Sequence, residues 1–327
     1  MSAMPGESGS SENEQFLRRE KIAFNFGGEK FTLDSVVEDT LPEGSDVGTV
    51  VAMHGAPGSH KDFKYITPHF RKAGIRFIGI NFPGYGLTEH DERLIHSNSE
   101  RVAYVQAVMD HLKLKQNVIF LGHSRGCECT LKVAALNEDK TVGVVSVNFI
   151  GVRIHRGIHP VWRLYVIDFL WNLGWPTRWF MRPLLLHIYN NFLKFRVRSA
   201  EVAALSLSSM IPWKVDHPGQ QIFVDKINRS GMKSLLLYSG RDAMIEREIS
   251  KEFVDLFKGN QHFVCDSSIT NDESVRHQVI EAFEAGTRSV SIFFKQGDHF
   301  LQKHEAQLLA DAIHTMFANK NDLSVSD

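Results

Sequence analysis

The chain has 327 residues, of which 43% are hydrophobic and 23% are charged. This length allows one large α/β domain with an inserted subdomain, or two modest domains, and the apolar fraction suffices for a sizeable core. The formal net charge of -1 gives no global indication of nucleic acid as a partner. Three cysteines, Cys127, Cys129 and Cys265, are too few and too unevenly spaced for a disulfide framework, so we expect a reducing compartment.

Residues 1–20 are rich in Ser, Gly and Glu and contain no apolar stretch. A secretory signal peptide needs such a stretch, and Ser2 stands where N-myristoylation requires Gly. We therefore expect a disordered tail over 1–20, a flexible tail over 319–327 and a cytoplasmic protein. The sequence contains no uninterrupted apolar run of about 18 residues, so no membrane-spanning helix is predicted.

Short β-rich runs alternate with helical patterns along most of the chain, which predicts a mostly parallel central sheet flanked by helices. The first two runs flank Gly27 and Gly28 and predict a hairpin. In chain order, strands are expected at 21–26, 30–37, 49–53, 76–81, 116–121, 142–148, 233–239 and 289–295, and helices near 61–72, after 97, at 125–136, near 273–284 and through 308–316.

The β/α rhythm stops between Gly151 and about Gly231. This stretch is helix-like and aromatic, and it contains all five tryptophans of the chain: Trp162, Trp171, Trp175, Trp179 and Trp213. We interpret it as a helical cap (151–230) inserted between two parts of an α/β core, 21–150 and 231–318.

The strongest functional signal is the run Gly122-His123-Ser124-Arg125-Gly126, between a predicted strand and a predicted helix. A serine hydroxyl is a weak nucleophile and must be exposed, oriented and served by a base. A sharp strand-to-helix turn presents the serine, and small residues two positions away on either side let the strand and the helix approach. The sequence therefore predicts a nucleophile elbow with Ser124 at its tip.

The run from His54 to Gly58 directly follows the strand expected at 49–53. Such a loop can supply one backbone N–H to an oxyanion, and the residue after the nucleophile supplies the other. The expected donors are Ala56 and Arg125. A plain Gly/Pro turn explains the same run, and the two interpretations are compatible. We expect His54 to brace the loop.

Asp242 and His299 are the candidates for the remaining catalytic groups. Asp242 follows the strand 233–239, at the edge where α/β sheets hold their sites. His299 follows the last strand, which gives the order Ser, Asp, His. Asn148 ends the preceding strand and rivals Asp242, but it cannot ionise; Asp242 can also be read as an ordinary capping residue. Asp298 is an unsuitable orienting acid because adjacent loop residues tend to point apart.

These motifs together resemble the α/β-hydrolase superfamily over about 21–317. The run 54–58, the turn 81–86 and the elbow are similar to the branch with epoxide hydrolases, haloalkane dehalogenases and small serine esterases. More narrowly, the chain is similar to a nematode-rich family of α/β hydrolases without assigned substrates. The resemblance implies an α/β-hydrolase fold. Ser124 stands where epoxide hydrolases and dehalogenases use aspartate, and 57 residues separate Asp242 from His299, which is longer than the pattern implies.

The segment 151–200 carries eight Lys and Arg residues and one acid, Asp168, a formal charge of +7. Basic and aromatic helices can lie at an anionic membrane surface or wall an apolar pocket under a lid. The third interpretation is that the aromatic residues pack on the core and the cations are solvated. The segment contains no recognised nucleic-acid module, so no nucleic-acid partner is expected.

The resulting hypothesis is a serine hydrolase that cleaves an ester or related acyl bond of a small lipophilic substrate through an acyl-Ser124 intermediate. Hydrolysis of a carbon–carbon bond with the same triad is a second hypothesis. A catalytically silent fold that binds a lipid or a protein is a third. No cofactor and no metal are expected, because the pair Cys127 and Cys129 lacks companion ligands at a useful spacing.

Overall fold

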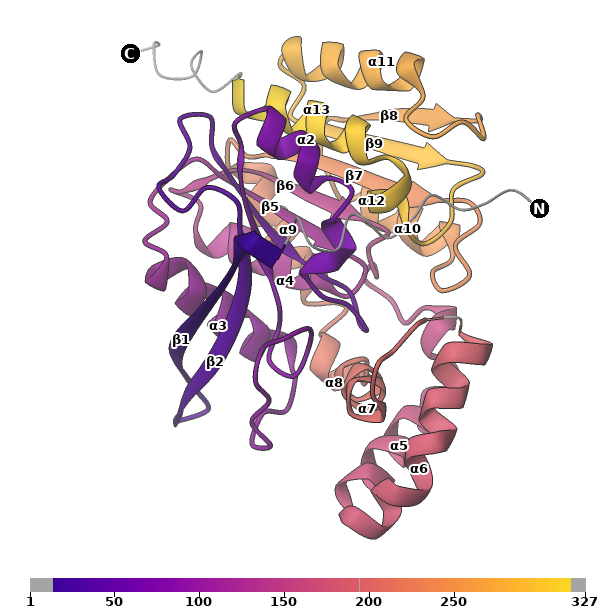
Figure 1. Cartoon of the computed structure of the whole chain (residues 1–327). Coiled ribbons are helices and arrows are strands. Elements are labelled where there is room, and N and C mark those ends of the chain that lie inside the picture. The colour runs from indigo at the N-terminus through magenta and orange to yellow at the C-terminus, as the bar shows by residue number, and fades with distance from the viewer. Residues whose placement is uncertain (1–13, 194, 319–327) are drawn as a thin grey trace, which may run out of the picture.

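The computed structural model describes residues 14–193 and 195–318. Within this range nine strands form one sheet in the order β1-β2-β4-β3-β5-β6-β7-β9-β8 (Figure 1). Strand β2 pairs antiparallel with β1 and β4, and all other pairs are parallel. The strands are β1 (Leu17–Phe26), β2 (Glu29–Asp39), β3 (Thr49–Met53), β4 (Arg76–Ile80), β5 (Val118–His123), β6 (Thr141–Val147), β7 (Lys233–Ser239), β8 (Asn260–Cys265) and β9 (Ser289–Phe294).

Helices cover both faces of the sheet, as the alternating pattern predicts. The helices in the described ranges are α2 (Thr67–Lys72), α3 (Asn98–His111), α4 (Gly126–Leu136), α5 (Trp162–Asn172), α6 (Trp175–His187), α7 (Ala200–Ser209), α8 (Pro212–Val215), α9 (Gln220–Arg229), α10 (Arg247–Val254), α11 (Glu273–Glu284), α12 (Leu301–His304) and α13 (Ala306–Ala318). Short 3-10 turns lie at η1 (Glu14–Phe16), η2 (His60–Phe63) and η3 (Arg156–Ile158), and a π-helical turn at η4 (Ile188–Phe192). The single helix expected near 61–72 is thus divided into η2 and α2.

The core consists of two apolar layers, one on each face of the sheet. Successive strand residues point to opposite faces, so Val51 packs with the layer under α3, α4, α9 and α10, whereas Val50 and Ala52 pack with the layer under α2, α11 and α13. The residues of β3, β4, β5 and β7 are all buried. This double burial explains why these strands are continuous apolar runs in the sequence.

The hairpin β1–β2 is present, but β1 begins at Leu17. Its first four residues pair with Ser35–Glu38, so the tail predicted for 1–20 is wrong at its end. Residues 1–13 and 319–327, which carry the rest of the predicted tails, lie outside the described residues. Gly27 and Gly28 have φ of 59° and 83°, the left-handed conformations that a two-residue hairpin turn requires.

The segment between Asp242 and His299 contains an edge strand that the sequence analysis does not predict. Strand β8 pairs with β9 at the end of the sheet, and α11 follows it. Most residues of β8 are exposed or half-buried, so it has no apolar run to reveal it. The extra β8–α11 unit accounts for the long separation between the two residues.

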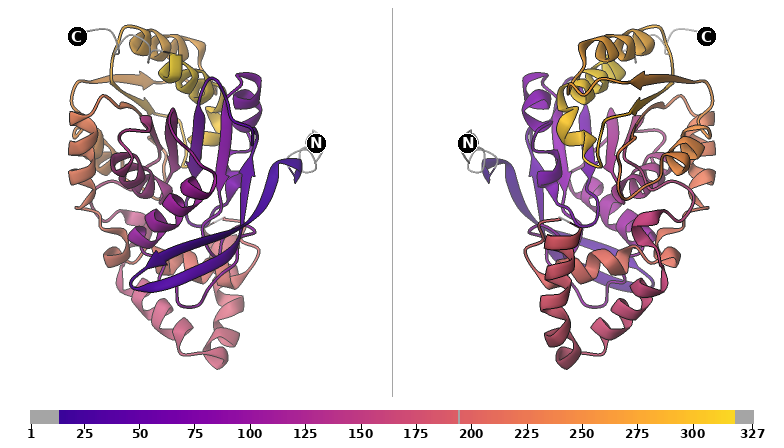
Figure 2. Two further views of the ribbon diagram at one scale, coloured as in Figure 1. Left: turned by 90° about the vertical axis from the view of Figure 1, so that its left-hand side faces the viewer. Right: turned by 90° about the vertical axis from the view of Figure 1, so that its right-hand side faces the viewer.

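The segment after Gly151 is helical, as predicted, but it does not form one unit. Helices α5 and α6 make a hairpin that projects away from the sheet (Figures 1 and 2), and α7 packs against both. In contrast, α9 packs on α4 in the core, through Val224 and Ile227. The predicted cap boundary at 230 is therefore too late, because α9 belongs to the helices that cover the sheet. In the described ranges, no helix combines the length and the apolarity that crossing a membrane demands.

Candidate active site

The turn between β5 and α4 holds Ser124 in a left-handed backbone conformation, with φ of 52°. This conformation is costly for a residue other than Gly and persists only where the surroundings enforce it. A Cβ on Gly122 would collide with Thr130 and Cys127, and one on Gly126 with the backbone carbonyls of β3 and of the residue after it. Both glycines are therefore required by close packing, as the predicted elbow implies.

Three side chains predicted from distant parts of the sequence meet at this turn. His299 Nε2 lies 3.1 Å from Ser124 Oγ, and His299 Nδ1 lies 2.7 Å from Asp242 Oδ2. Ser124 is half-buried, whereas His299 and Asp242 are buried. Both distances lie within hydrogen-bond range. The arrangement can pass a proton from the serine to the histidine while the carboxylate holds the ring.

The carboxyl group of Asp242 is held in its ionised form. Burial acts to raise its pKa, but hydrogen bonds and charge attraction outweigh this effect and lower the pKa. The donors are His299 and the backbone N–H groups of Met244 and Ile245, which lie 2.8 and 3.1 Å from Oδ1. An ionised acceptor at this position fixes the proton on Nδ1 of the histidine and leaves Nε2 free to accept.

Asn148, the predicted rival of Asp242, is instead its partner. It follows β6, and its Nδ2 donates to Asp242 Oδ2 at 3.1 Å and to Ser239 Oγ at 2.7 Å. Asp298 turns away from the imidazole, since its Oδ1 accepts from the N–H of Phe300 at 2.8 Å. The sequence position of Asn148 at a strand end signalled its place at the site, but not its role.

The loop 54–58 passes directly over the serine. A Cβ on Gly55 would lie 3.2 Å from Ser124 Cβ. In the part of the chain that the structure describes, the backbone N–H groups of Ala56 and Arg125 have no hydrogen-bond acceptor. Both predicted donors are therefore unoccupied beside the nucleophile. His54 braces the loop, as expected, because its Nδ1 donates to the Gly55 carbonyl at 2.7 Å.

His123 and Asp62 form a second polar pair beside the serine. His123 Nε2 donates to the backbone carbonyl of His299 at 2.9 Å, which ties the elbow to the loop of the base. Burial lowers the pKa of His123 to about 3 and raises the pKa of Asp62 to about 7. Their nearest ring nitrogen and carboxylate oxygen are 3.9 Å apart. The sequence held no signal for Asp62, which reaches the site only through the fold.

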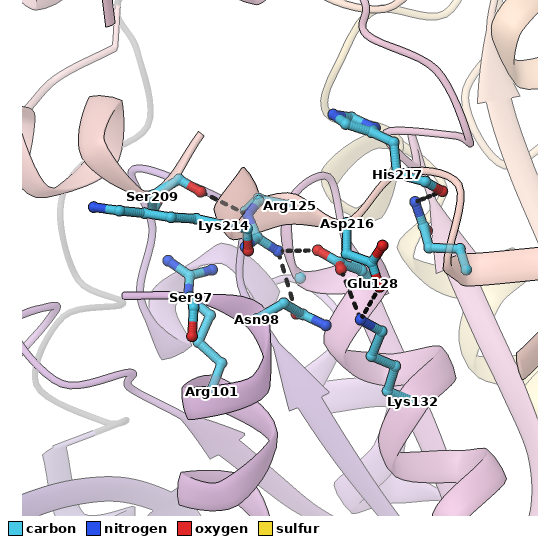
Figure 3. Close-up of polar contacts among 12 residues, drawn as sticks. Ser97, Asn98, Arg101, Arg125, Glu128, Lys132, Ser209, Lys214, Asp216 and His217 are labelled. Atoms are coloured by element: carbon cyan, nitrogen blue, oxygen red, sulfur yellow. Dashed lines mark hydrogen bonds and ion pairs between the residues drawn. The ribbon is translucent and has the colours of Figure 1, made fainter. Parts of the chain in front are cut away.

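The side chain of Arg125 has a role that the sequence analysis did not foresee (Figure 3). Its guanidinium is fully buried and donates to Glu128 Oε2 at 2.6 Å and to Asn98 Oδ1 at 3.3 Å. It also donates to the backbone carbonyls of Ser209 and Lys214, both at 3.2 Å. These carbonyls belong to α7 and α8, so the residue after the nucleophile anchors the capping helices to the elbow.

The same cluster continues outward from Glu128. Lys132 Nζ lies 3.2 Å from Glu128 and 3.1 Å from Asp216 (Figure 3). Burial raises the pKa of Glu128, and the charges of Arg125 and Lys132 oppose this shift. Burial likewise lowers the pKa of Arg125 to about 10. Each buried charge in the cluster thus has an opposite charge beside it, which offsets part of the desolvation cost.

A hollow of about 390 Å³ opens beside the loop over the serine. Its lining includes Pro57 and Gly58 from that loop, Phe195 and Val202 from the capping segment, and Phe300. The rings of Phe195 and Phe300 are 6.0 Å apart, and Phe300 contacts the His299 ring at 5.6 Å. The hollow thus borders the loop that follows Ala56, and Phe300 connects it to the histidine.

Comparison with known proteins places this geometry in a family. Residues 18–318 match the family described as alpha/beta hydrolase of unknown function (DUF1057). An uncharacterized protein of Caenorhabditis elegans is 29% identical over 300 residues, which cover 88% of this chain and 83% of that protein. A serine hydrolase-like protein of Dictyostelium discoideum is 25% identical over 212 residues, 64% of this chain and 53% of that protein.

A solved structure agrees on the fold. The haloalkane dehalogenase DbeA from Bradyrhizobium elkani superimposes with a TM-score of 0.61 at 14% identity, over 94% of this chain and 99% of that one. At this identity the likeness concerns the fold alone. The predicted fold, a mostly parallel sheet flanked by helices, is thus confirmed, and so is the resemblance stated from the motifs. Since the family match runs through almost the whole chain, the protein belongs to this alpha/beta hydrolase family.

Proposed function

We propose that the protein is a serine hydrolase that cleaves an ester or related acyl bond through an acyl-Ser124 intermediate. The observation that carries this proposal is the position of His299, whose two ring nitrogens lie 3.1 Å from Ser124 Oγ and 2.7 Å from Asp242 Oδ2. A serine joined to a base that is itself oriented by a carboxylate is the arrangement that activates a hydroxyl for acyl transfer.

In the first half of the reaction, Ser124 Oγ attacks the substrate carbonyl carbon while His299 Nε2 takes the hydroxyl proton. The oxygen of the tetrahedral intermediate gains negative charge, and the N–H groups of Ala56 and Arg125 stabilise it. When the bond to the leaving group breaks, His299 gives the proton to that group. In the second half, a water molecule loses a proton to His299 and attacks the acyl carbon, and Ser124 is regenerated.

The substrate that we propose is lipophilic. Phe195, Val202 and Phe300 give the hollow beside the loop 54–58 an apolar wall, and binding sites for small molecules are mostly apolar with a few polar groups that fix orientation. Carbon–carbon bond hydrolysis needs the same nucleophile and base, so a panel of esters and diketones decides between the two reactions.

The first experiment is labelling of the purified protein with a fluorophosphonate probe, which reacts only with an activated serine. We expect strong labelling of the wild type and none of Ser124→Ala, with a loss of at least about a hundredfold for His299→Ala. Ser268→Ala and His277→Ala are matched controls. Ser268 and His277 are exposed and far from the site in the sequence, so both variants should label like the wild type.

Absence of labelling in a folded wild type would refute the proposal and favour the silent, ligand-binding alternative. Labelling that survives in Ser124→Ala would show that another serine is the reactive one. Labelling together with turnover of diketones, but not of esters, would assign the chain to carbon–carbon bond hydrolysis.

A further inference from the structure

The α5–α6 hairpin exposes an apolar surface that the proposed chemistry does not use. The two helices extend away from the sheet and meet at the far end of the projection (Figure 2). We propose that this hairpin docks the protein on the surface of a membrane that contains anionic lipid. The proposal concerns where the protein works and is independent of whether Ser124 is catalytic.

Helix α5 carries one of two exposed apolar faces. Its large exposed side chains recur at helical spacing, so they share a side of the helix. They are Trp162, Tyr165, Val166 and Phe169, with Leu173 just after the helix. This stripe is not the face that packs on the protein, because Leu164 is the buried residue of the helix and Ile167 and Leu170 contribute to the contact with α7.

Helix α6 carries the second exposed apolar face. Trp175 is 80% exposed, Trp179 63% and Phe180 70%, and the rings of Trp179 and Phe180 contact each other at 4.7 Å. The inner face of the helix is already occupied, since Met181 and Leu185 are buried against α7. Soluble monomers seldom expose so many large apolar residues together, and such patches mark an interaction site.

The charge around the patch favours an anionic partner. The segment 151–200 carries +7 while the whole chain carries -1, so the remaining residues carry -8. The hairpin itself, residues 162–187, carries Arg163, Arg178 and Arg182 against Asp168, a formal charge of +2. Arg178 and Arg182 are paired with Glu92 and Glu201. The positive segment beside an acidic remainder would turn the hairpin toward a negative surface. On α5, Arg163 has no ion-pair partner among the described residues, and its guanidinium lies 5.8 Å from the Trp162 ring.

A lipid surface accounts for both features of the patch. Tryptophan is suited to the interface between headgroups and acyl chains because its ring is apolar and its N–H is polar. Arginines beside such rings reach the lipid phosphates. A second copy of the chain is the other candidate occupant, but two hairpins of the same positive charge would repel each other.

The test is flotation of the full-length protein with vesicles of phosphatidylcholine alone and of phosphatidylcholine with about 30% phosphatidylserine. We expect flotation with the mixed vesicles, much weaker flotation with the neutral ones, and loss of binding as NaCl rises from about 0.1 M to about 0.5 M. Because all five tryptophans lie within 162–213, their fluorescence should shift to the blue on binding. Ser124→Ala should float like the wild type.

The decisive variant is Trp175→Ser/Trp179→Ser/Phe180→Ser, which removes exposed rings only. We expect its partition onto the mixed vesicles to fall by about tenfold or more. The matched control is Ile222→Ser/Ile269→Ser, because Ile222 and Ile269 are 69% and 71% exposed but lie outside the hairpin. It should bind like the wild type. Arg163→Gln should weaken binding to the mixed vesicles and leave the weak binding to neutral ones unchanged.

A folded wild type that neither floats nor shifts its fluorescence with the mixed vesicles would overturn the proposal. Equal loss of binding in the control variant would also overturn it, since the hairpin would then have no special role. Light scattering tests the other candidate occupant, a second copy of the chain. A dimer that the triple variant abolishes would assign the patch to self-association instead of lipid.

Discussion

Asn148 at the end of β6 combines a left-handed backbone, with φ of 47°, and a hydrogen bond to the carboxylate of Asp242. Asparagine is one of the few residues that tolerate this conformation readily. Its side-chain amide is placed by the strand that precedes it and donates to Asp242 Oδ2, the same oxygen that His299 Nδ1 contacts. The residue thus serves the proposed triad by holding its acid.

We expect Asn148→Gly to lower kcat by about tenfold to a hundredfold, because a hydrogen bond to a charged group is worth about 1.5–3 kcal/mol. Glycine keeps the left-handed backbone, so the change removes the side-chain contacts of Asn148 with Asp242, Ser239 and the loop of His299 without straining the chain. KM for an ester should change little. The reference is Asp242→Asn, for which the loss should approach about ten-thousandfold. Steady-state kinetics of both variants are the measurement, and an unchanged kcat for Asn148→Gly would exclude the positioning role.

Glu38 in β2 is a buried acid with no part in the site. Its side chain is fully buried, and neither carboxyl oxygen has a hydrogen-bond partner among the described residues. Burial raises its pKa to about 7, against the opposing charges of Arg71 and Lys61. The folded protein therefore holds this proton more tightly than the unfolded chain does, and the stability that results is lost as the pH rises toward 7.

Replacement of Glu38 by Gln should stabilise the protein at pH 8.5 by about 2 kcal/mol and have almost no effect at pH 5, where the carboxyl group is neutral in the fold. Urea denaturation at the two pH values measures the difference. Glu43→Gln is the control, because Glu43 is exposed, and it should have no effect at either pH. A stabilisation of equal size at both pH values would show that ionisation is not the cause.

At the scale of elements, Arg125 joins α4 to α7 and α8 by buried hydrogen bonds. Arg125→Met would leave Glu128 with Lys132 as its only oppositely charged neighbour in the described cluster. We expect a loss of about 3 kcal/mol in the free energy of unfolding. The double variant Arg125→Met/Glu128→Met should lose much less free energy of unfolding than the sum of the two single changes, because neither member of the pair is then left buried without the other.

The exposed ion pair between Arg182 and Glu201, at 2.8 Å, is the matched comparison in the same capping segment. Arg182→Met should cost less than about 1 kcal/mol, since exposed pairs contribute little. Urea denaturation of the four variants and the wild type completes the cycle. Additive losses for Arg125 and Glu128 would contradict the coupling that the 2.6 Å contact implies.

The helices and strands also show how much of the fold can be predicted from the sequence. Strands buried on both faces, such as β7, were predicted to the residue because their apolar runs are continuous. Strand β8 was missed because its exposed residues interrupt that pattern. Helix α9 was assigned to the cap because a helical pattern predicts a helix but not the surface against which the helix packs. In the site, strand ends indicated Ser124, Asp242 and His299. The contacts of the Arg125 side chain and the position of Asp62 beside His123 depend on segments that are distant in the sequence, so no local pattern predicts them.

At the scale of the whole molecule, the fold buries many groups in their neutral form. Six buried histidines have a lowered pKa: His54, His60, His96, His123, His155 and His217. Five buried or half-buried acids have a raised pKa: Glu38, Asp62, Glu100, Glu128 and Glu305. In every one of these groups burial is the largest cause, and it penalises the charged form.

The two sets act in opposite directions on stability. A histidine with a lowered pKa stabilises the fold above about pH 6.5, and this contribution is lost as the pH falls. The acids stabilise the fold at low pH, and their contribution is lost as the pH rises above about 4.5. For Glu38, Asp62 and Glu305, whose pKa values are raised to about 7, the loss extends to that pH. Between these values the contributions largely cancel. Below about pH 4.5 the acids with a raised pKa become protonated in both states. The buried histidines still take up protons on unfolding there, and so do Asp242 and Asp91, whose pKa values are lowered in the fold.

We therefore expect the free energy of unfolding to decline by only about 1–3 kcal/mol from pH 6.5 to pH 4.5 and to fall steeply below that, by several kcal/mol per pH unit. Denaturant midpoints at half-unit steps between pH 4 and pH 8 measure this curve. Glu38→Gln removes one of the opposing acids, so its curve should decline more steeply than that of the wild type between pH 6.5 and 4.5. A stability that rises as the pH falls through 4.5 would show that the buried histidines are already charged in the fold.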